Sequence, residues 1–158
     1  MEPAVLAPAA TDINTLFPVF LKPEQLNILV VGGGKVGLEK VSALFNNCPE
    51  AKVTLVAPEI EPAIYQLKSR APFFEIIERE FAEEDLTGRD ILLLATENHS
   101  LNEAISQLAK EKKILINVAD TPGLCDFYLG SIVQKGNLKI AISTNGKSPT
   151  IAKRMREM

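Results

Sequence analysis

The chain has 158 residues, of which 46% are hydrophobic and 23% are charged, as expected for a globular domain with a substantial core. No apolar stretch approaches the roughly 20 residues of a membrane-spanning helix, and the start of the sequence lacks the features of an export signal. The two cysteines, Cys48 and Cys125, give neither a disulfide framework nor a metal-binding pattern. We therefore expect a cytoplasmic protein without a membrane partner.

The net charge of −3 is unevenly distributed. From Lys135 onward six basic residues face one acid, a net charge of +5, whereas the first 134 residues hold 11 basic and 19 acidic residues, a net charge of −8. A basic end on an acidic body indicates that this end meets an anion. The alternative is a solvated helix end without a ligand.

The first elements in chain order are irregular. Residues 1–13 are rich in Ala and Pro without periodicity and predict a loose leader. Residues 15–21, "TLFPVFL", form a short apolar run broken by Pro18, which predicts an edge strand or an extended packing segment.

A regular alternation then begins and defines the expected domain at residues 14–122. Near-continuously apolar strands alternate with helical patterns, which is typical of a parallel sheet covered on both faces. Right-handed crossovers favour a Rossmann-like, doubly wound α/β fold. The strands are expected at residues 26–31, 52–57, 73–78, 90–96 and 114–119, and the helices at 35–46, 60–70 and 100–113.

The alternation stops after Asp120. Residues 126–144 predict two strands joined by the turn-forming residues 134–137, within a strand-rich segment at 123–147. Such a pair must bury its apolar faces, and a partner subunit is one possibility. Ser148 as N-cap and Pro149 as first residue then open a helix at 148–158 that is too short to be stable alone. We expect it to begin a larger helical domain of which most is missing.

Glycines follow the first strand in the pattern Gly32-x-Gly34-x-x-Gly37. With a strand before and a helix after, this spacing predicts a dinucleotide site in which Gly34, Lys35 and Val36 face the pyrophosphate at the helix N-terminus. The alternative is a tight glycine turn without a ligand.

The end of the second strand decides between NAD and NADP in many such sites. Here Ala57 and Pro58 fill the position of the usual acid, and Glu59 follows slightly late. No arginine stands beside it to bind a 2′-phosphate, so the sequence leans toward NAD without settling the choice.

Several segments together resemble the precorrin-2 dehydrogenase/sirohydrochlorin ferrochelatase family, over residues 14–156. The most specific are "INVADTPGLCDF" and "IAISTNGKSPTIAKRMR", alongside "LVVGGGKVGLEK", "VTLVAP" and "REFAEEDLTGRDILLLAT". The resemblance implies an NAD-binding Rossmann domain, a dimerisation segment at 123–147 and the start of a helical domain. It implies a homodimer that oxidises precorrin-2 to sirohydrochlorin with NAD, and in some members also inserts Fe²⁺. No nucleic-acid partner is expected.

The resemblance also implies site residues. Asp120, at the end of the fifth strand, corresponds to the family's catalytic aspartate, and a carboxylate there is suited to accept a proton. Taken alone, it is equally a turn residue before Thr121-Pro122. The expected cofactor-binding residues are Gly32, Gly34, Lys35, Val36, Gly37, Pro58, Glu59, Thr96 and Asn117. The expected substrate-binding residues are Thr144, Asn145, Gly146, Lys147, Ser148 and Lys153.

Three further points concern single residues. Thr144 occupies a position that resembles a phosphorylated serine of some members, and modification there stays open. Asp126 is expected to be a strand-entry residue, Cys125 a packing residue, and His99 an exposed helix-capping residue. Because the sequence has no His/Cys cluster, no protein-held metal is expected. The alternative function is a regulatory Rossmann module that senses NAD without catalysis, and the sequence does not separate a purely oxidising enzyme from a bifunctional one.

Overall fold

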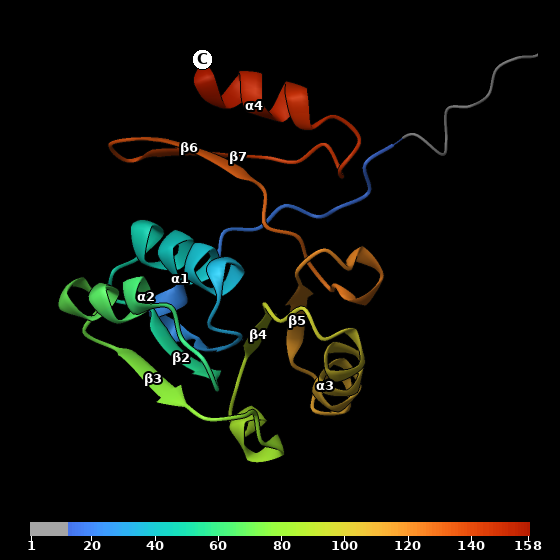
Figure 1. Cartoon of the computed structure of the whole chain (residues 1–158). Helices are drawn as coiled ribbons and strands as arrows, with labels where there is room; N and C mark the ends of the chain where they lie inside the picture. Colours follow the sequence, from blue (N-terminus) through green and yellow to red (C-terminus); the bar gives the residue numbers. More distant parts are fainter. Residues whose placement is uncertain (1–12) are drawn as a thin grey trace, which may run out of the picture. The chain divides into compact units, whose positions relative to one another are not determined.

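A computed structural model describes residues 13–158, so the predicted leader lies almost entirely outside the described residues. The chain forms two compact units (Figure 1). The larger unit is Leu21–Tyr128, and the smaller combines the described residues 13–20 with Leu129–Met158. Over the described part of the chain, no helix is both long and apolar enough to cross a membrane.

The larger unit is built on a parallel five-stranded sheet with the order β3-β2-β1-β4-β5. This is the strand order of doubly wound nucleotide-binding folds, so the predicted fold class is confirmed. The strands are β1 (Asn27–Val31), β2 (Lys52–Ala57), β3 (Phe74–Glu78), β4 (Ile91–Leu94) and β5 (Leu115–Val118). The helices are α1 (Lys35–Asn47), α2 (Pro62–Gln66) and α3 (His99–Glu111), with 3₁₀ turns η2 (Pro23–Gln25), η3 (Leu67–Arg70), η4 (Glu83–Leu86) and η5 (Pro122–Leu124).

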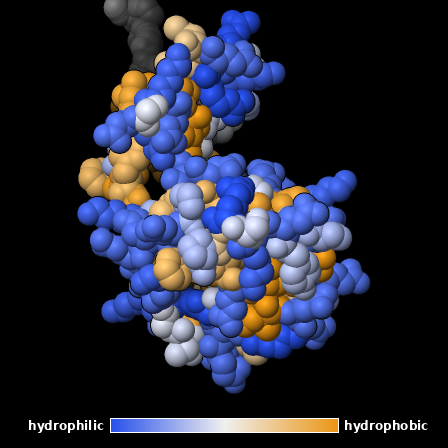
Figure 2. Space-filling view, turned by 90° about the vertical axis from the view of Figure 1, so that its left-hand side faces the viewer, coloured by the Kyte–Doolittle hydropathy of each residue, from blue (hydrophilic) through white to orange (hydrophobic). Residues whose placement is uncertain are grey.

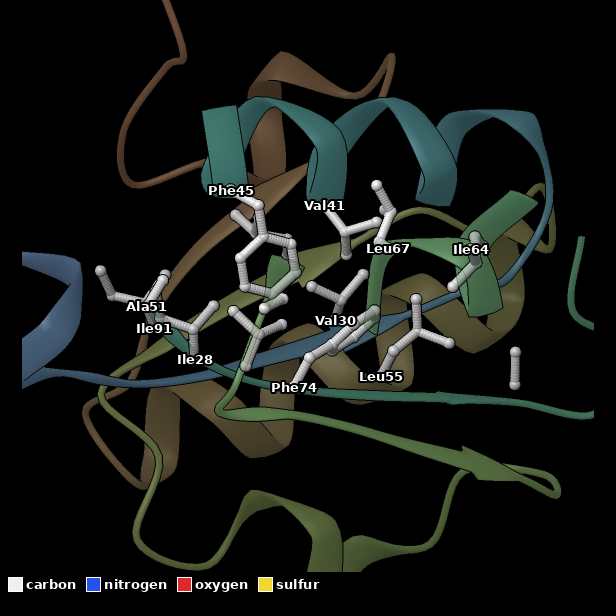
Figure 3. Packing of buried hydrophobic residues seen from close by; sticks show 14 residues of the cluster. Ile28, Val30, Val41, Phe45, Ala51, Leu55, Ile64, Leu67, Phe74 and Ile91 are labelled. Carbon is white, nitrogen blue, oxygen red and sulfur yellow. The ribbon is translucent and has the colours of Figure 1, made fainter. Parts of the chain in front are cut away.

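Alternate residues along each strand enter separate cores on the two faces of the sheet. On one face, Val41 and Phe45 of α1 point onto Ile28, Val30 and other strand residues, with Ile64 of α2 beside them (Figure 3). The rings of Phe45 and Phe74 pack tilted at a centroid distance of 4.9 Å. The other face packs against α3. Its buried side chains are Leu29, Val31, Val56, Leu86, Leu92, Leu94, Ile105, Ala109, Ile114, Ile116 and Val118.

One predicted helix of the larger unit is wrong in its bounds. The helix expected at 60–70 starts only at Pro62, because a residue before proline favours an extended backbone, and Glu61 has a ψ of 132°. It continues beyond Gln66 only as the 3₁₀ turn η3. Of the two alternatives for residues 15–21, the edge strand is excluded: these residues form no strand, and Phe17 and Phe20 are largely exposed.

The smaller unit contains the predicted strand pair, β6 (Ser131–Lys135) and β7 (Leu138–Ile142), paired antiparallel. β6 begins at Ser131 and not at Asp126, so the strand-entry role predicted for Asp126 is wrong; its side chain accepts the amide of Ile116 in β5 instead. Gly136, with a φ of +57°, provides the left-handed position of the tight turn between them. Helix α4 (Pro149–Glu157) follows, with the Ser148 side chain accepting a hydrogen bond from the Ile151 amide as the sequence predicted. Hydrophobic surface is visible on this unit in the upper part of Figure 2, and the exposed apolar side chains of the hairpin include Ile132, Leu138 and Ile140.

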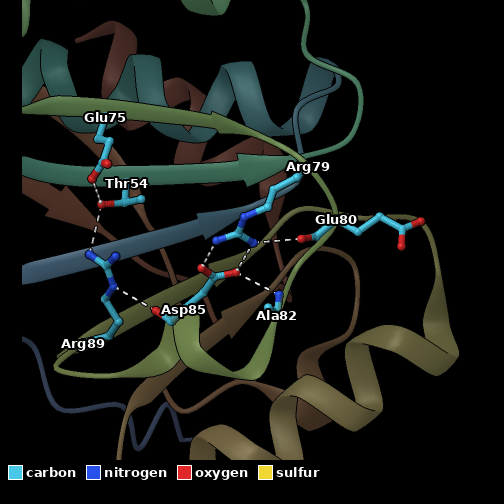
Figure 4. Close-up of polar contacts among 7 residues, drawn as sticks. All are labelled: Thr54, Glu75, Arg79, Glu80, Ala82, Asp85 and Arg89. Carbon is cyan, nitrogen blue, oxygen red and sulfur yellow. Dashed lines mark hydrogen bonds and ion pairs between the residues drawn. The ribbon is translucent and has the colours of Figure 1, made fainter.

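A polar network fixes the loop between β3 and β4 (Figure 4). Asp85 is 8% exposed, and both its carboxylate oxygens accept hydrogen bonds from the Arg79 guanidinium, at 2.6 and 2.9 Å. The same carboxylate accepts a hydrogen bond from the amide of Ala82. The backbone carbonyl of Asp85 accepts one from Nε of Arg89. Arg89 in turn donates to Thr54 in the middle of β2. The network therefore ties η4 to the sheet.

The Asp85 network predicts a loss of stability in acid. The hydrogen bond from Arg79 lowers the pKa of the Asp85 carboxyl below its usual 3.8. This stabilisation is complete above pH 3.8 and is lost as the pH falls through the lower folded-state pKa. At neutral pH we expect Asp85→Asn to lower the free energy of unfolding by about 1–2 kcal/mol, a figure reduced for the half-exposed Arg79. Urea unfolding between pH 2 and 7 measures both effects, and the difference between wild type and variant should shrink in acid. Glu83→Gln, an exposed neighbour, is the control; an Asp85 variant that matches it at all pH values would refute this role.

Candidate functional site

The hydrogen-bond ladder of the sheet continues beyond the carboxyl ends of three strands. The amide of Gly32 donates to Val56 of β2, that of Ala95 to Val31 of β1, and that of Ala119 to Leu94 of β4. The loops that leave β1, β4 and β5 therefore start side by side at one edge of the sheet. Adjacent strands lie about 4.8 Å apart, so Ala119 starts roughly 10 Å from Gly32. This edge is where doubly wound folds bind their ligands.

The glycine turn after β1 is packed against its neighbours on several sides. Gly32 has a φ of +123°, and a Cβ there would lie 2.5 Å from the Ala95 carbonyl oxygen. A Cβ on Gly33 would meet the Glu59 carbonyl oxygen, and one on Gly37 would meet the carbonyl oxygen of Gly32. Glycine at these positions lets helix α1 and the loops after β2 and β4 approach the end of β1 directly.

Gly34, in contrast, faces open space, since no atom lies within 4 Å of the Cβ position. It is the N-cap of α1, whose first internal hydrogen bond runs from Leu38 to the Gly34 carbonyl. The amides of Lys35, Val36 and Gly37 thus lie outside the helical ladder, at the positive end of the helix dipole. Bare backbone, free amides and open space are the features that bind a pyrophosphate.

The β2 exit flanks the glycine turn. Pro58 and Glu59 are both exposed, and the Glu61 amide donates a 2.8 Å hydrogen bond to the Gly33 carbonyl. This bond fixes the β2–α2 loop relative to the turn. The Glu59 backbone lies beside the turn as well, since its carbonyl oxygen would meet a Cβ built on Gly33.

At the β4 exit, the predicted site residue Thr96 pairs with Asn102, which the sequence analysis did not single out. Asn102 of α3 is 1% exposed; its Oδ1 accepts the Thr96 hydroxyl at 2.6 Å, and its Nδ2 donates to the Thr96 carbonyl at 3.0 Å. The signal in the sequence was a polar residue on the buried stripe of an amphipathic helix. Helix α3 is capped by Asn98, whose side chain accepts the Leu101 amide, so the capping role predicted for His99 is wrong. His99 is the exposed first residue of the helix.

Asp120 follows β5 directly and is exposed. Its φ is +57°, a left-handed conformation that is uncommon for residues other than glycine and is enriched for Asp and Asn. Strained backbone of this kind is often found at functional sites. The carboxylate thus leaves the sheet at the same edge as the glycine turn, two strands away.

Asn117 is buried and its side-chain amide is already engaged. Its Nδ2 donates to the Phe127 carbonyl at 2.9 Å and lies 3.7 Å from Sγ of Cys125. These contacts belong to a segment, residues 125–127, that covers the outer edge of β5. The sequence analysis did not predict this arrangement, although it identified "CDF" as specific.

The expected substrate-binding residues lie in the smaller unit: Lys153 is within α4, and the others are in the turn before this helix and at its N-cap. The Thr144 carbonyl accepts a hydrogen bond from the Lys147 amide, and the Thr144 hydroxyl accepts one from the Ser148 amide. Asn145 and Gly146 have left-handed φ values of +55° and +75°. Lys147 and Lys153 are exposed. Within the described residues 13–158, no group of three or more His, Cys, Asp or Glu side chains could hold a metal.

The strand order and the glycine turn define the larger unit as a dinucleotide-binding Rossmann domain. The chain belongs to the family described as "Putative NAD(P)-binding", whose model matches residues 19–131. Residues 135–158 match the family described as "Sirohaem biosynthesis protein central". The prediction of a nicotinamide dinucleotide cofactor is confirmed at the level of NAD(P).

Similar proteins agree with these families. The siroheme synthase of Thioalkalivibrio sulfidiphilus is 39% identical over 140 residues, which cover 89% of this chain and 28% of the relative. That of Psychrobacter arcticus is 38% identical over 144 residues, covering 91% and 26%. The chain therefore spans less than a third of these curated relatives. The solved structure of SirC, a precorrin-2 dehydrogenase, matches with a TM-score of 0.72 and 26% identity, covering 90% of this chain and 68% of that one. The predicted resemblance is confirmed.

The glycine turn predicts different effects for two similar substitutions. Gly32→Ala introduces a Cβ at a left-handed position beside the Ala95 carbonyl. We therefore expect the free energy of unfolding to fall by about 2 kcal/mol and NAD⁺ binding to be lost as well. Gly34→Ala has room for its Cβ and an extended φ of −88°, so we expect normal stability but dinucleotide binding weakened by about tenfold or more. Thermal unfolding and calorimetric titration with NAD⁺ measure the two effects separately. If Gly34→Ala bound NAD⁺ with wild-type affinity, the pyrophosphate could not be assigned to this turn.

Proposed function

We propose that the protein catalyses the NAD-dependent oxidation of precorrin-2 to sirohydrochlorin. The observation that carries this proposal is the exposed carboxylate of Asp120, at the exit of β5 and at the same sheet edge as the glycine turn. The siroheme synthase names of the relatives and the precorrin-2 dehydrogenase name of the solved structure support the choice of substrate.

The reaction removes a hydride and a proton from the reduced macrocycle. NAD⁺ supplies the hydride acceptor, bound with its pyrophosphate at the amides of Lys35 and Val36. The Asp120 carboxylate takes the proton, as a general base held at the edge of the crevice. A regulatory module that only senses NAD needs no such base, and this distinction favours the enzyme.

NAD is proposed as the preferred cofactor over NADP. The exposed Glu59 carboxylate beside the glycine turn is suited to accept the ribose hydroxyls and would repel a 2′-phosphate. Pro58 is proposed to shape the same pocket, and Thr96 and Asn117 to line the crevice at the exits of β4 and β5. The Asn117 side chain would contribute indirectly, since its amide is bonded to Phe127.

The polycarboxylate substrate is proposed to bind the turn before α4. The half-buried Thr144 and Ser148 and the exposed Asn145 and Gly146 lie in a polar turn at a helix N-terminus, where anions are favoured. The side chains of Lys147 and Lys153 add positive charge. Phosphorylation of Thr144, a homodimer and a cytoplasmic location stay predictions.

Insertion of Fe²⁺ into sirohydrochlorin is proposed as a second activity. The names of the relatives, siroheme synthases, favour it. Asp120 would accept pyrrole protons in this step, and the iron would be a substrate. If the protein reduced NAD⁺ with precorrin-2 but inserted no iron when Fe²⁺ was supplied, it would be assigned to oxidation only.

The proposed oxidation predicts that Asp120→Asn abolishes turnover. The protein with precorrin-2 and NAD⁺ should give NADH absorbance at 340 nm and sirohydrochlorin, with and without Fe²⁺ in parallel. The variant should lose about 10²-fold or more in kcat, because the amide cannot act as a base, and should keep NAD⁺ affinity. Glu97→Gln, an exposed carboxylate at the same sheet edge, should retain activity. Retained turnover in Asp120→Asn would remove this residue from the reaction.

The apolar hairpin predicts a homodimer. A two-stranded sheet that exposes Ile132, Leu138 and Ile140 is marginally stable alone, and a second copy would bury this surface. Light scattering at micromolar concentration should give twice the chain mass. Ile140→Asp should shift the mass to that of a monomer, whereas Phe73→Ser, an exposed aromatic of the larger unit, should not. A monomeric wild type would refute the dimer.

A further inference from the structure

Cys125 and Asp126 contact the free edge of β5, immediately after the turn that bears Asp120. We propose that these two residues, named here the edge clamp, are positioning residues that hold the Asp120 turn in its working conformation. This inference rests on the proposed role of Asp120. It assigns a function to the "CDF" segment that no catalytic or metal-binding role explains.

Asp126 pairs with Ile116 through two hydrogen bonds. Its amide donates to the Ile116 carbonyl at 2.7 Å, and its Oδ2 accepts the Ile116 amide at 3.0 Å. Because β5 is the last strand of the sheet, these outward-facing groups of Ile116 have no strand to pair with. Asp126 replaces that strand with one backbone group and one side chain.

Cys125 pairs in a similar way with Val118, which is two residues closer to Asp120 along the chain. Its Sγ accepts the Val118 amide at 3.1 Å and lies within donating distance of the carbonyls of Val118, at 3.3 Å, and Thr121, at 3.5 Å. The thiol therefore touches the residues on both sides of Ala119 and Asp120. Cys125 and Leu124 also pack against the core on the α3 face of the sheet, which anchors the segment.

The clamp thus closes a short loop whose two ends are both fixed. Val118 is fixed by β4 on one side and by the thiol on the other, and Ala119 by its bond to Leu94. Thr121 is bonded to the Ala119 carbonyl through its hydroxyl and reached by the thiol. Between these points Asp120 is held at a φ of +57°, a conformation that a free chain of non-glycine residues adopts rarely. Without the clamp, the turn would keep its own bond from the Thr121 amide to the Val118 carbonyl, at 3.3 Å, but would lose its anchor to the following segment. We expect the Asp120 carboxylate to be less firmly positioned as a result.

The chain contains matched controls for both clamp residues. Asp90 makes the same two bonds with Asn27, its amide donating to the carbonyl at 2.9 Å and its Oδ2 accepting the amide at 2.8 Å. Asn27 begins β1 and Asp90 immediately precedes β4. Both therefore lie at the amino ends of the strands, whereas Asp120 lies at the carboxyl end of β5. Cys48 follows α1 and contacts Glu24, also remote from the β5 exit.

The test compares Cys125→Ala and Asp126→Ala with Cys48→Ala and Asp90→Ala in the full chain. A misplaced base should lower kcat by about 10-fold to 100-fold in the clamp variants, with the KM for NAD⁺ within about twofold of wild type. Cys125→Ser and Asp126→Asn keep acceptor atoms and should recover most of this loss. Both control variants should retain kcat, even where Asp90→Ala lowers the melting temperature.

A second readout needs no substrate and separates this inference from the proposed function. In the NMR spectrum of the apoprotein, the Asp120 Cα and Cβ shifts should move away from left-handed values in the clamp variants only. Amide exchange should accelerate at Val118 in Cys125→Ala and at Ile116 in Asp126→Ala. If wild type does not oxidise precorrin-2, these shifts still decide whether the clamp holds the turn. Unchanged Asp120 shifts and unchanged kcat in both clamp variants would overturn the proposal.

Discussion

The close approach of backbone to backbone at the end of β1 is the constraint on which the rest of the site depends. A Cβ on Gly32 would meet the Ala95 carbonyl, and a Cβ on Gly37 of α1 would meet the Gly32 carbonyl. These contacts align the exits of β1 and β4 and place the N-terminus of α1 at the carboxyl ends of the strands. On the proposed function, the first amides of α1 bind the pyrophosphate without any basic side chain being required.

A second constraint arises because β5, the strand that leads to Asp120, is the outermost strand of the sheet. In a sheet ordered β3-β2-β1-β4-β5, the proposed base follows a strand that is paired on one side only. Polar backbone groups on such an edge are normally paired, covered or exposed to water. Here a thiol and a carboxylate pair with Val118 and Ile116 in place of a strand. The outer edge of β5 is thereby paired just before the turn that holds Asp120, without lengthening the sheet.

Much of the fold was predictable because each strand of a doubly covered sheet is almost continuously apolar, as in "ILLL" of β4. Boundaries were less predictable where local and tertiary effects compete. Pro62 delays α2, and the apolar run at 15–21 does not form a strand. The glycine turn could be located because its spacing reflects backbone contacts. The Asn102–Thr96 pair and the edge clamp could not, because single polar residues reveal nothing about partners distant in sequence or around a turn.

The charge distribution suggests why two anions would be bound by different means. The cofactor crevice lies in the part of the chain with a net charge of −8, and its anion site is made of fixed backbone dipoles. Such dipoles suit a pyrophosphate held in one fixed geometry. The segment from Lys135 onward has a net charge of +5 carried by flexible side chains. Flexible cations act over a Debye length and adapt to the scattered carboxylates of a macrocycle. On the proposed function, cofactor and substrate are thus recognised by different kinds of positive charge, fixed dipoles for the one and mobile side chains for the other.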